Sequence, residues 1–221
     1  MDVAPFISFL TRYWPVFVDG LQITAFVAVL AAPAAFIAGI LLVLPAVSGW
    51  KGLAAVVRGF VELMRNTPLL VQIYLLYFGL PLLGIFWGAI TCGVIAIALQ
   101  HGAFLSEIVR AGIQSLSVRQ WEAGQSIGMR RFAILRLVIL PQALIKVTPA
   151  LGNQLIVLVK DTSLVSAIGV MDLTLTGKVL IERSGMSFEV FIAVALFYLI
   201  LTTSLGIAAR LVETFVARRY A

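Results

Sequence analysis

Long apolar runs without any charged residue dominate the chain, and short polar segments separate them. No charge falls between Asp19 and Lys51, or between Arg65 and Glu107. A bilayer core of about 30 Å needs roughly 20 apolar residues in a helix. Pro68 should kink its helix near Asn66 and Thr67. The pattern predicts an all-α integral membrane protein with five transmembrane helices, at about residues 21–44, 54–78, 85–111, 145–170 and 190–209.

Composition supports a membrane protein and excludes several other classes. The 221 residues are 62% hydrophobic and only 12% charged, whereas soluble domains carry about a quarter charged residues. A disordered chain and a coiled coil are excluded, and a soluble enzyme is not expected. A single Cys and a single His cannot form a disulfide framework or a structural zinc site. We therefore expect no metal site and no catalytic residues.

The distribution of basic residues predicts the orientation in the membrane. Five spans place the two ends of the chain on opposite sides, and the side richer in Lys and Arg is cytoplasmic. We expect a periplasmic N-terminus and a cytoplasmic C-terminus. Topology thus accounts for the net charge of +6, and no nucleic-acid partner is expected. The predicted cytoplasmic cations are Lys51, Arg58, Arg65, Arg110, Arg119, Arg130, Arg131, Arg136, Lys146, Arg210, Arg218 and Arg219, against Arg12, Lys178 and Arg183 outside.

The segment of about residues 112–141 is too polar to span the membrane. Ser117 and Gln120 form a capping-box pattern, with Leu116 and Trp121 at the hydrophobic staple positions. This pattern predicts a helix from Val118 to about Met129, followed by a second helix near residues 130–138. Gly124 and Gly128 would share one face of the first helix, where close approach of another backbone would explain two glycines. The residues leave two roles open, a membrane-surface helix that binds anionic lipid or a helix that docks on a partner protein.

Several polar residues fall inside the predicted spans. Ionisable groups at this depth face protein or water, and Lys160 with Asp161 is the clearest case. These residues either line a translocation path or form hydrogen bonds and ion pairs that join helices. The path candidates are Gln72, Gln100, His101, Asn153, Gln154, Lys160 and Asp161.

Two further patterns have structural explanations. Arg58, Glu62 and Arg65 share one helical face, as do Glu107 and Arg110, and both groups predict salt bridges at the membrane rim. Small residues at 31–39 allow close helix packing, either within the chain or against a second subunit.

The loop motif resembles a known family signature. Glu122, Ala123 and Gly124 are followed after three residues by Gly128, and then by Val138, Leu140 and Pro141. This spacing is similar to the EAA loop of ABC-importer permeases, with Gly124 in place of the second Ala and Val138 in place of Ile. Similarity to the polar amino-acid branch extends over nearly the whole chain, through Asp19–Thr24, Arg65–Gln72, Glu107–Ile113 and Lys160–Leu164.

The resemblance implies a single transmembrane domain over residues 1–221. It implies a permease subunit of an ATP-driven importer of polar amino acids, multi-pass in the bacterial inner membrane. The implied partners are an ATP-binding cassette ATPase dimer, a second permease, a periplasmic amino-acid-binding protein and membrane lipid. The chain has no G-x-x-x-x-G-K-[ST] loop, so ATP and Mg would be bound by the ATPase. The implied ATPase-coupling residues are Glu122, Ala123, Gly124, Gly128, Met129 and Arg130.

Two other classes were considered from the sequence. A self-contained secondary amino-acid transporter predicts inverted repeats and a coupling-ion site, and the two halves of the chain show no such repeat. A membrane scaffold without transport activity would not need Lys160 and Asp161 at membrane depth. We therefore expect the importer subunit, whose chain performs no enzymatic chemistry itself.

Overall fold

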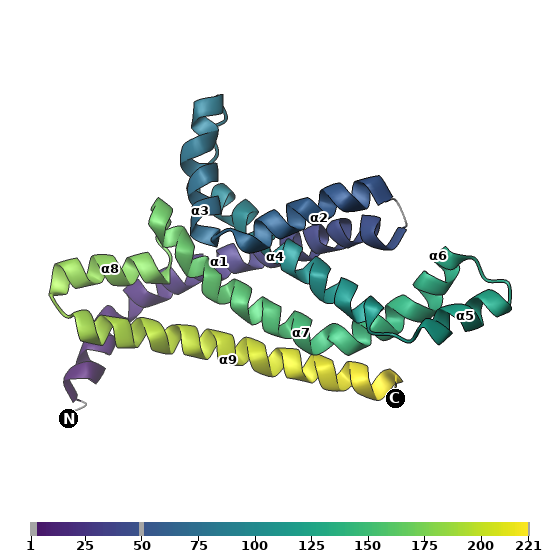
Figure 1. The fold of residues 1–221 in the computed structure, drawn as a ribbon. Coiled ribbons are helices and arrows are strands. Elements are labelled where there is room, and N and C mark those ends of the chain that lie inside the picture. The colour runs from purple at the N-terminus through teal and green to yellow at the C-terminus, as the bar shows by residue number, and fades with distance from the viewer. Residues whose placement is uncertain (1–3, 49–50, 221) are drawn as a thin grey trace. The chain divides into compact units, whose positions relative to one another are not determined.

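The computed structural model describes residues 4–48 and 51–220, and all regular structure in those ranges is helical. Figure 1 shows the order of the helices along the chain. The elements are α1 (Ala4–Ser48), α2 (Lys51–Asn66), α3 (Leu69–Tyr74), a π-helical turn η1 (Leu75–Gly79), a 3-10 turn η2 (Leu80–Leu83), α4 (Ala89–Gln114), α5 (Val118–Ser126), α6 (Arg131–Ile134), a π-helical turn η3 (Leu135–Ile139), α7 (Leu140–Asp161), a 3-10 segment η4 (Thr162–Ile168), α8 (Leu173–Ser184) and α9 (Ser187–Tyr220).

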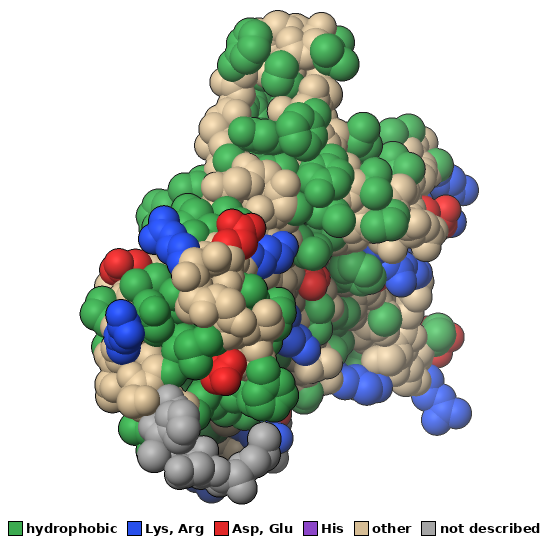
Figure 2. Space-filling view, turned by 90° about the vertical axis from the view of Figure 1, so that its left-hand side faces the viewer, with side chains coloured by type: hydrophobic (Ala, Val, Ile, Leu, Met, Phe, Trp, Pro, Cys, Tyr) green, Lys and Arg blue, Asp and Glu red, His purple; other side chains and the backbone are tan. Residues whose placement is uncertain are grey.

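The helices that can cross a membrane agree with the predicted spans. Four stretches of the described residues are long and apolar enough, and a fifth is obtained when the bent pair α2 and α3–η2 counts as one span. Many large hydrophobic side chains of these helices are exposed, among them Ile37 and Leu41 on α1 and Ile200 on α9, as expected for helices that contact lipid. Figure 2 shows hydrophobic side chains together with charged ones on the face that it draws. The all-α membrane class is therefore confirmed.

The second predicted span is broken where the sequence predicts a kink. Thr67 and Pro68 lie between α2 and α3, and Pro68 has extended backbone angles of φ −61° and ψ 135°. A proline has no N–H to donate and disfavours helical geometry at the preceding residue, so the helix must stop there.

The fourth span differs from its prediction at both ends. The long helical stretch begins at Arg131 rather than near residue 145, because the turn η3 leads directly into α7. Regular α-helix then ends at Asp161, and η4 continues the stretch to Ile168. Lys160 and Asp161 thus lie at a junction between two helix types, near one end of the stretch instead of its middle.

The chain forms two compact units. The first contains residues 1–33, 67–97 and 156–205, and the second contains residues 34–66, 98–155 and 206–221. In the first unit, apolar residues of α1, α8 and α9 form the core, including the fully buried Phe17, Leu173 and Val190. Phe9 belongs to the same core, so α1 begins well before residue 21, where the first predicted span starts.

Helix α8 was not predicted from the sequence, and its N-terminus is held by α1. Thr24 accepts a hydrogen bond from the backbone N–H of Leu173 at 3.0 Å and donates one to the Gly20 carbonyl at 3.1 Å. A Cβ at Gly20 would lie 2.7 Å from the Thr176 hydroxyl, so only glycine permits this approach. Gly20 and Thr24 therefore position α8 on α1.

In the second unit, α1 and α4 pack closely through small residues. A Cβ at Gly102 would lie 2.6 Å from the Ala38 Cβ and 3.1 Å from the Ala35 carbonyl oxygen. A Cβ at Gly39 would lie 2.9 Å from the Leu105 Cβ. Ala35, Ala38 and Gly39 thus serve packing within the chain, one of the two roles that the sequence left open.

Candidate functional site

The loop helix α5 begins where the capping pattern predicts. Ser117 has extended backbone angles, and its hydroxyl accepts a hydrogen bond from the Arg119 N–H at 3.3 Å. Leu116 and Trp121 pack against one apolar cluster formed by Ile134, Leu135 and Ile139. The cap and the staple both direct the chain into α5.

Helix α5 ends earlier than predicted. It stops at Ser126 rather than near Met129, and Gly128 follows with a positive φ of 79°. The Gly128 N–H bonds to the Gln125 carbonyl at 2.9 Å, and the Met129 N–H bonds to the Gly124 carbonyl at 3.1 Å. These two bonds form a Schellman motif. The prediction that Gly124 and Gly128 share a helical face was therefore wrong, because Gly128 terminates the helix.

Gly124 has a packing role within the loop. It is buried, and a Cβ there would lie 2.7 Å from the Ile134 side chain. The close neighbour that the sequence predicted for this glycine is thus a side chain of α6, not another backbone. Figure 1 shows α5 and α6 side by side, consistent with this contact.

The predicted coupling residues divide into an exposed set and an inward set. Glu122, Ala123, Gly128 and Arg130 are exposed, whereas Gly124 is buried and Met129 packs on the loop's apolar cluster. Arg131 lies over the Trp121 ring, with its guanidinium carbon 5.7 Å from the ring centroid. The sequence reading missed the exposed apolar side chains Ile127 and Phe132, which are 78% and 68% exposed. The presence of apolar residues in such a polar segment was the sequence signal that could have indicated them.

Of the predicted path residues, His101 and Gln154 meet directly. His101 is buried, and its Nδ1 lies 2.8 Å from the Gln154 Nε2, joining α4 to α7 within the second unit. Because an amide N–H₂ donates, the His101 Nδ1 accepts this bond.

Gln100 and Gln72 form hydrogen bonds with residues next to the break after α2. The Gln100 Nε2 donates to the Met64 carbonyl at 3.2 Å, satisfying a carbonyl in the last turn of α2. The Gln72 Nε2 donates to the Thr67 hydroxyl at 2.8 Å. Both side chains therefore have a structural role, whatever their part in transport. Of the remaining candidates, Asn153 and Lys160 are exposed and Asp161 is half-buried.

Of the two groups of charged rim residues, one pairs as predicted and the other does not. The Arg110 Nε and Nη2 donate to the two oxygens of Glu107 at 2.8 and 2.6 Å, as the i, i+3 spacing predicts. Arg65 also approaches Glu107, at 3.4 Å, rather than pairing along α2 with Glu62. This ion pair joins α2 to α4, because α2 turns the Arg65 side chain toward its neighbour.

A buried polar network lies in the first unit, and no sequence pattern predicted it. Asp172 caps α8 by accepting the Leu175 N–H at 2.9 Å, and the Tyr198 hydroxyl donates to its second oxygen at 3.3 Å. Tyr198 also lies 3.2 Å from the Thr174 hydroxyl. Burial raises the pKa of Asp172 above its ordinary value, although these hydrogen bonds oppose the shift.

Fold and site together define a multi-pass helical membrane protein with a structured polar loop. No group of three metal-ligating side chains is found in the described ranges. Residues 35–218 match the model of the family described as binding-protein-dependent transport system inner membrane component. The chain belongs to this family, and is therefore a permease subunit in the bacterial inner membrane.

The similar proteins cover almost the whole chain. It is 34% identical to the probable glutamine ABC transporter permease GlnM of Bacillus subtilis, over 97% of this chain and 99% of the relative. It is 35% identical to the glutamine transport system permease GlnP of Escherichia coli K12, over 90% and 92% of the two chains. A crystal structure of an amino acid ABC transporter with histidines superposes with a TM-score of 0.88, at 36% identity over 97% and 98% of the chains. The methionine transporter MetNI shares the fold, with a TM-score of 0.75 at 20% identity.

Proposed function

We propose that this chain forms the membrane path of an ATP-driven importer of polar amino acids. The similarity to amino-acid permeases over nearly the full length of the chain is the observation that carries this proposal. Residues 1–221 act as one transmembrane domain paired with a second permease. The path receives its cargo from a periplasmic binding protein. Separate ATPase subunits bind ATP and Mg. The self-contained secondary transporter is disfavoured by the family match.

The N-terminus is periplasmic and the C-terminus cytoplasmic in this proposal. The excess of Lys and Arg on the side that includes the α5–α6 loop supports this orientation. The loop then lies in the cytoplasm, on the side where ATP is available.

The α5–α6 loop, residues 112–141, is the proposed contact with the ATPase. Ile127 and Phe132 of this loop are exposed, and burying them against a partner would stabilise the complex. Glu122 of α5 is also exposed and supplies a charge for pairing. Gly124 and Met129 contribute from inside, by holding α5 against α6. The compact loop would transmit ATPase closure to the bundle as a rigid element.

Reversal of the charge at Glu122 tests the coupling role. We expect Glu122→Arg to lower co-purification with the ATPase and transport-coupled ATP hydrolysis at least about tenfold, on the scale of a disrupted interface charge pair. Glu182→Arg is the matched control, because Glu182 is also exposed but lies on α8. Unchanged complex formation and coupling in Glu122→Arg would exclude the docking role.

His101 and Gln154 are the path residues that the geometry supports best. They are joined across two helices by a hydrogen bond and lie at membrane depth. We expect Gln154→Leu to change the KM for the cargo. Gln142→Leu on the same helix should leave the KM unchanged, since the Gln142 side chain donates to the Val138 carbonyl of the preceding turn η3. Uptake into proteoliposomes containing the whole transporter measures this, and equal KM values for the two variants would remove Gln154 from the path.

A further inference from the structure

A polar cavity of about 350 Å³ lies between α2 and α4, within the second unit. The ion pair between Glu107 and Arg110 forms part of its wall, but the cavity itself has no role in the fold or in coupling. Five of its lining residues carry charge. The lining residues are Arg58, Val61, Glu62, Arg65, Glu107, Arg110 and Gln114.

The charges around this cavity do not balance. Three guanidinium groups face two carboxylates, which leaves one positive charge among the lining residues. Arg58, Glu62 and Arg65 are exposed, so this positive charge is accessible to a ligand from outside the bundle. One monovalent anion in the cavity would neutralise it.

Glu107 is already occupied by its neighbours. Both of its oxygens accept from Arg110, and the Arg65 Nη1 adds a contact at 3.4 Å. The Arg110 Nη1 donates to the Gln114 amide oxygen at 3.0 Å. Three of the roughly four acceptor positions of Glu107 are therefore used, and the third guanidinium of the cavity makes no hydrogen bond to it.

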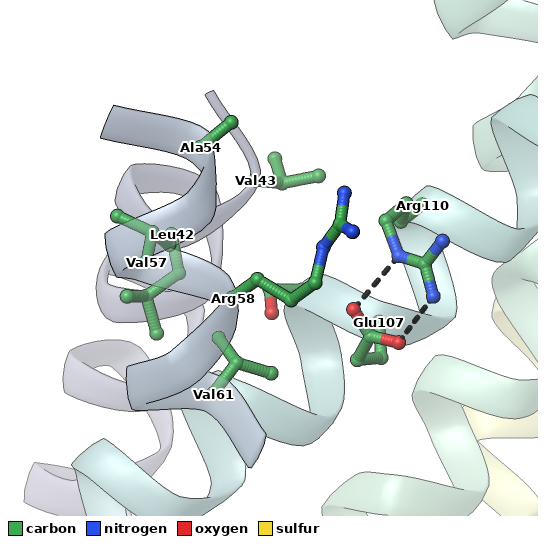
Figure 3. A pocket seen from close by; sticks show the side chains of 9 residues that line it. Leu42, Val43, Ala54, Val57, Arg58, Val61, Glu107 and Arg110 are labelled. Atoms are coloured by element: carbon green, nitrogen blue, oxygen red, sulfur yellow. Dashed lines mark hydrogen bonds and ion pairs between the residues drawn. The ribbon is translucent and has the colours of Figure 1, made fainter. Parts of the chain in front are cut away.

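Arg58 is that third guanidinium. In residues 4–48 and 51–220 no acceptor bonds to its side chain, and Figure 3 shows it extending from α2 toward Glu107 and Arg110. A second, smaller space of about 30 Å³ is lined by Arg58 and by Leu42 and Val43 of α1.

We propose that this cavity is a binding site for a monovalent oxyanion, a carboxylate or a phosphodiester, held by Arg58 together with the remaining donors of Arg65 and Arg110. Guanidinium groups match both oxyanions with paired N–H donors. The carboxylate of Glu62 keeps the net charge of the lining residues at +1, which favours an anion with a single negative charge. The same chemistry is offered by a soluble carboxylate and by the headgroup of an anionic phospholipid. The site depends neither on the proposed cargo nor on coupling.

The experiment titrates the full chain in lipid nanodiscs and follows its thermal unfolding midpoint, which a ligand of the folded state raises. One arm adds acetate or dimethyl phosphate to nanodiscs of phosphatidylcholine. The other raises the mole fraction of phosphatidylglycerol without soluble oxyanion. The arm in which the midpoint rises identifies the source of the anion, and a rise in both arms means that the site accepts either.

The variants decide whether this cavity is responsible. We expect Arg58→Gln to weaken the apparent affinity by about tenfold or more, the scale of a lost charge-assisted hydrogen-bond pair. Lys51→Gln removes the same charge from the same helix, away from the cavity, and should titrate like the wild type. If Arg58→Gln also titrates like the wild type, or if both variants lose affinity equally, the site does not exist.

Glu62→Gln gives a measurement that does not rely on loss of function. It raises the charge of the lining residues from +1 to +2, so oxyanion affinity should increase severalfold over the wild type in the responsive arm. Unchanged or weaker affinity in Glu62→Gln would overturn the proposal, even if Arg58→Gln failed to fold.

Discussion

Gly128 occupies a left-handed backbone conformation with a φ of 79°, at the position where α5 ends. An L side chain in this region costs about 1 kcal/mol or more, and asparagine tolerates it better than alanine. The glycine of the loop motif is thus explained by helix termination. It is needed so that the chain can leave α5 and return along α6.

We predict that Gly128→Ala loosens α5 while Gly128→Asn largely preserves it. Hydrogen–deuterium exchange of residues 118–129 measures this directly. The alanine variant should exchange several times faster, on the scale of about 1 kcal/mol of lost local stability. Equal protection in the alanine variant and the wild type would mean that the left-handed turn is not required.

Asp172 is a second residue whose chemistry depends on its surroundings. It is fully buried, and burial raises its pKa despite hydrogen bonds from Leu175, Thr174 and Tyr198. A carboxyl whose folded-state pKa is raised binds its proton more tightly when folded than when unfolded. Its contribution to stability is therefore lost as the pH rises above the unfolded pKa and through the folded pKa.

We predict that Asp172→Asn removes this pH dependence. Its amide oxygen can still cap α8, but it carries no charge to desolvate. The unfolding midpoint of Asp172→Asn relative to the wild type should increase as the pH rises from about 4 toward neutrality. A difference that stays constant with pH, measured by thermal unfolding in detergent, would contradict a raised pKa.

At the scale of elements, the closest helix packing depends on residues that lack side-chain volume. Gly39 and Gly102 bring α1 and α4 together, with Ala35 and Ala38 as their neighbours. In a bilayer, helices gain little from the hydrophobic effect when they associate, so close van der Waals contact matters more. Small residues at this contact are consistent with that physics.

We predict that Gly102→Ala destabilises the protein by about 1–3 kcal/mol, the range for overpacking a tight core. Its methyl group would meet the Ala38 Cβ at 2.6 Å. Gly59→Ala is the control, because a Cβ at Gly59 has no neighbour within 4 Å and the residue lies inside α2. Gly59→Ala should be neutral or slightly stabilising. If Gly102→Ala is as stable as Gly59→Ala in detergent unfolding, the α1–α4 contact can accommodate a methyl group and the prediction is wrong.

At the scale of the whole molecule, the proposed orientation places the loop and α8 on opposite sides of the membrane. We predict that Ser126→Cys reacts with a membrane-impermeant maleimide only from the cytoplasmic side, and Ser187→Cys only from the periplasmic side. Both serines are exposed, whereas the native Cys92 is buried and should remain unlabelled. Labelling of Ser126→Cys in intact spheroplasts would show that the orientation is the opposite one and that the loop does not contact the ATPase.

The sequence was sufficient for features that depend on local chemistry. Long apolar runs indicated five membrane spans, because a charge in hydrocarbon is costly wherever the rest of the chain lies, but they gave the wrong bounds for the fourth. Pro68 marked the break after α2, and Ser117 marked the start of α5, because a missing N–H and a capping hydroxyl act on the adjacent backbone. The loop motif identified the family for the same reason, since it is a contiguous pattern.

Tertiary structure alone decided the features that depend on residues far apart in the chain. Gly124 could not be assigned to Ile134, nor Thr24 to Leu173, until α6 and α8 were in place. Arg65 could satisfy either Glu62 or Glu107 by spacing and charge, and only the approach of α4 selected Glu107. Burial, pairing and close contact are properties of neighbours in space, and a single sequence does not record which neighbours those are.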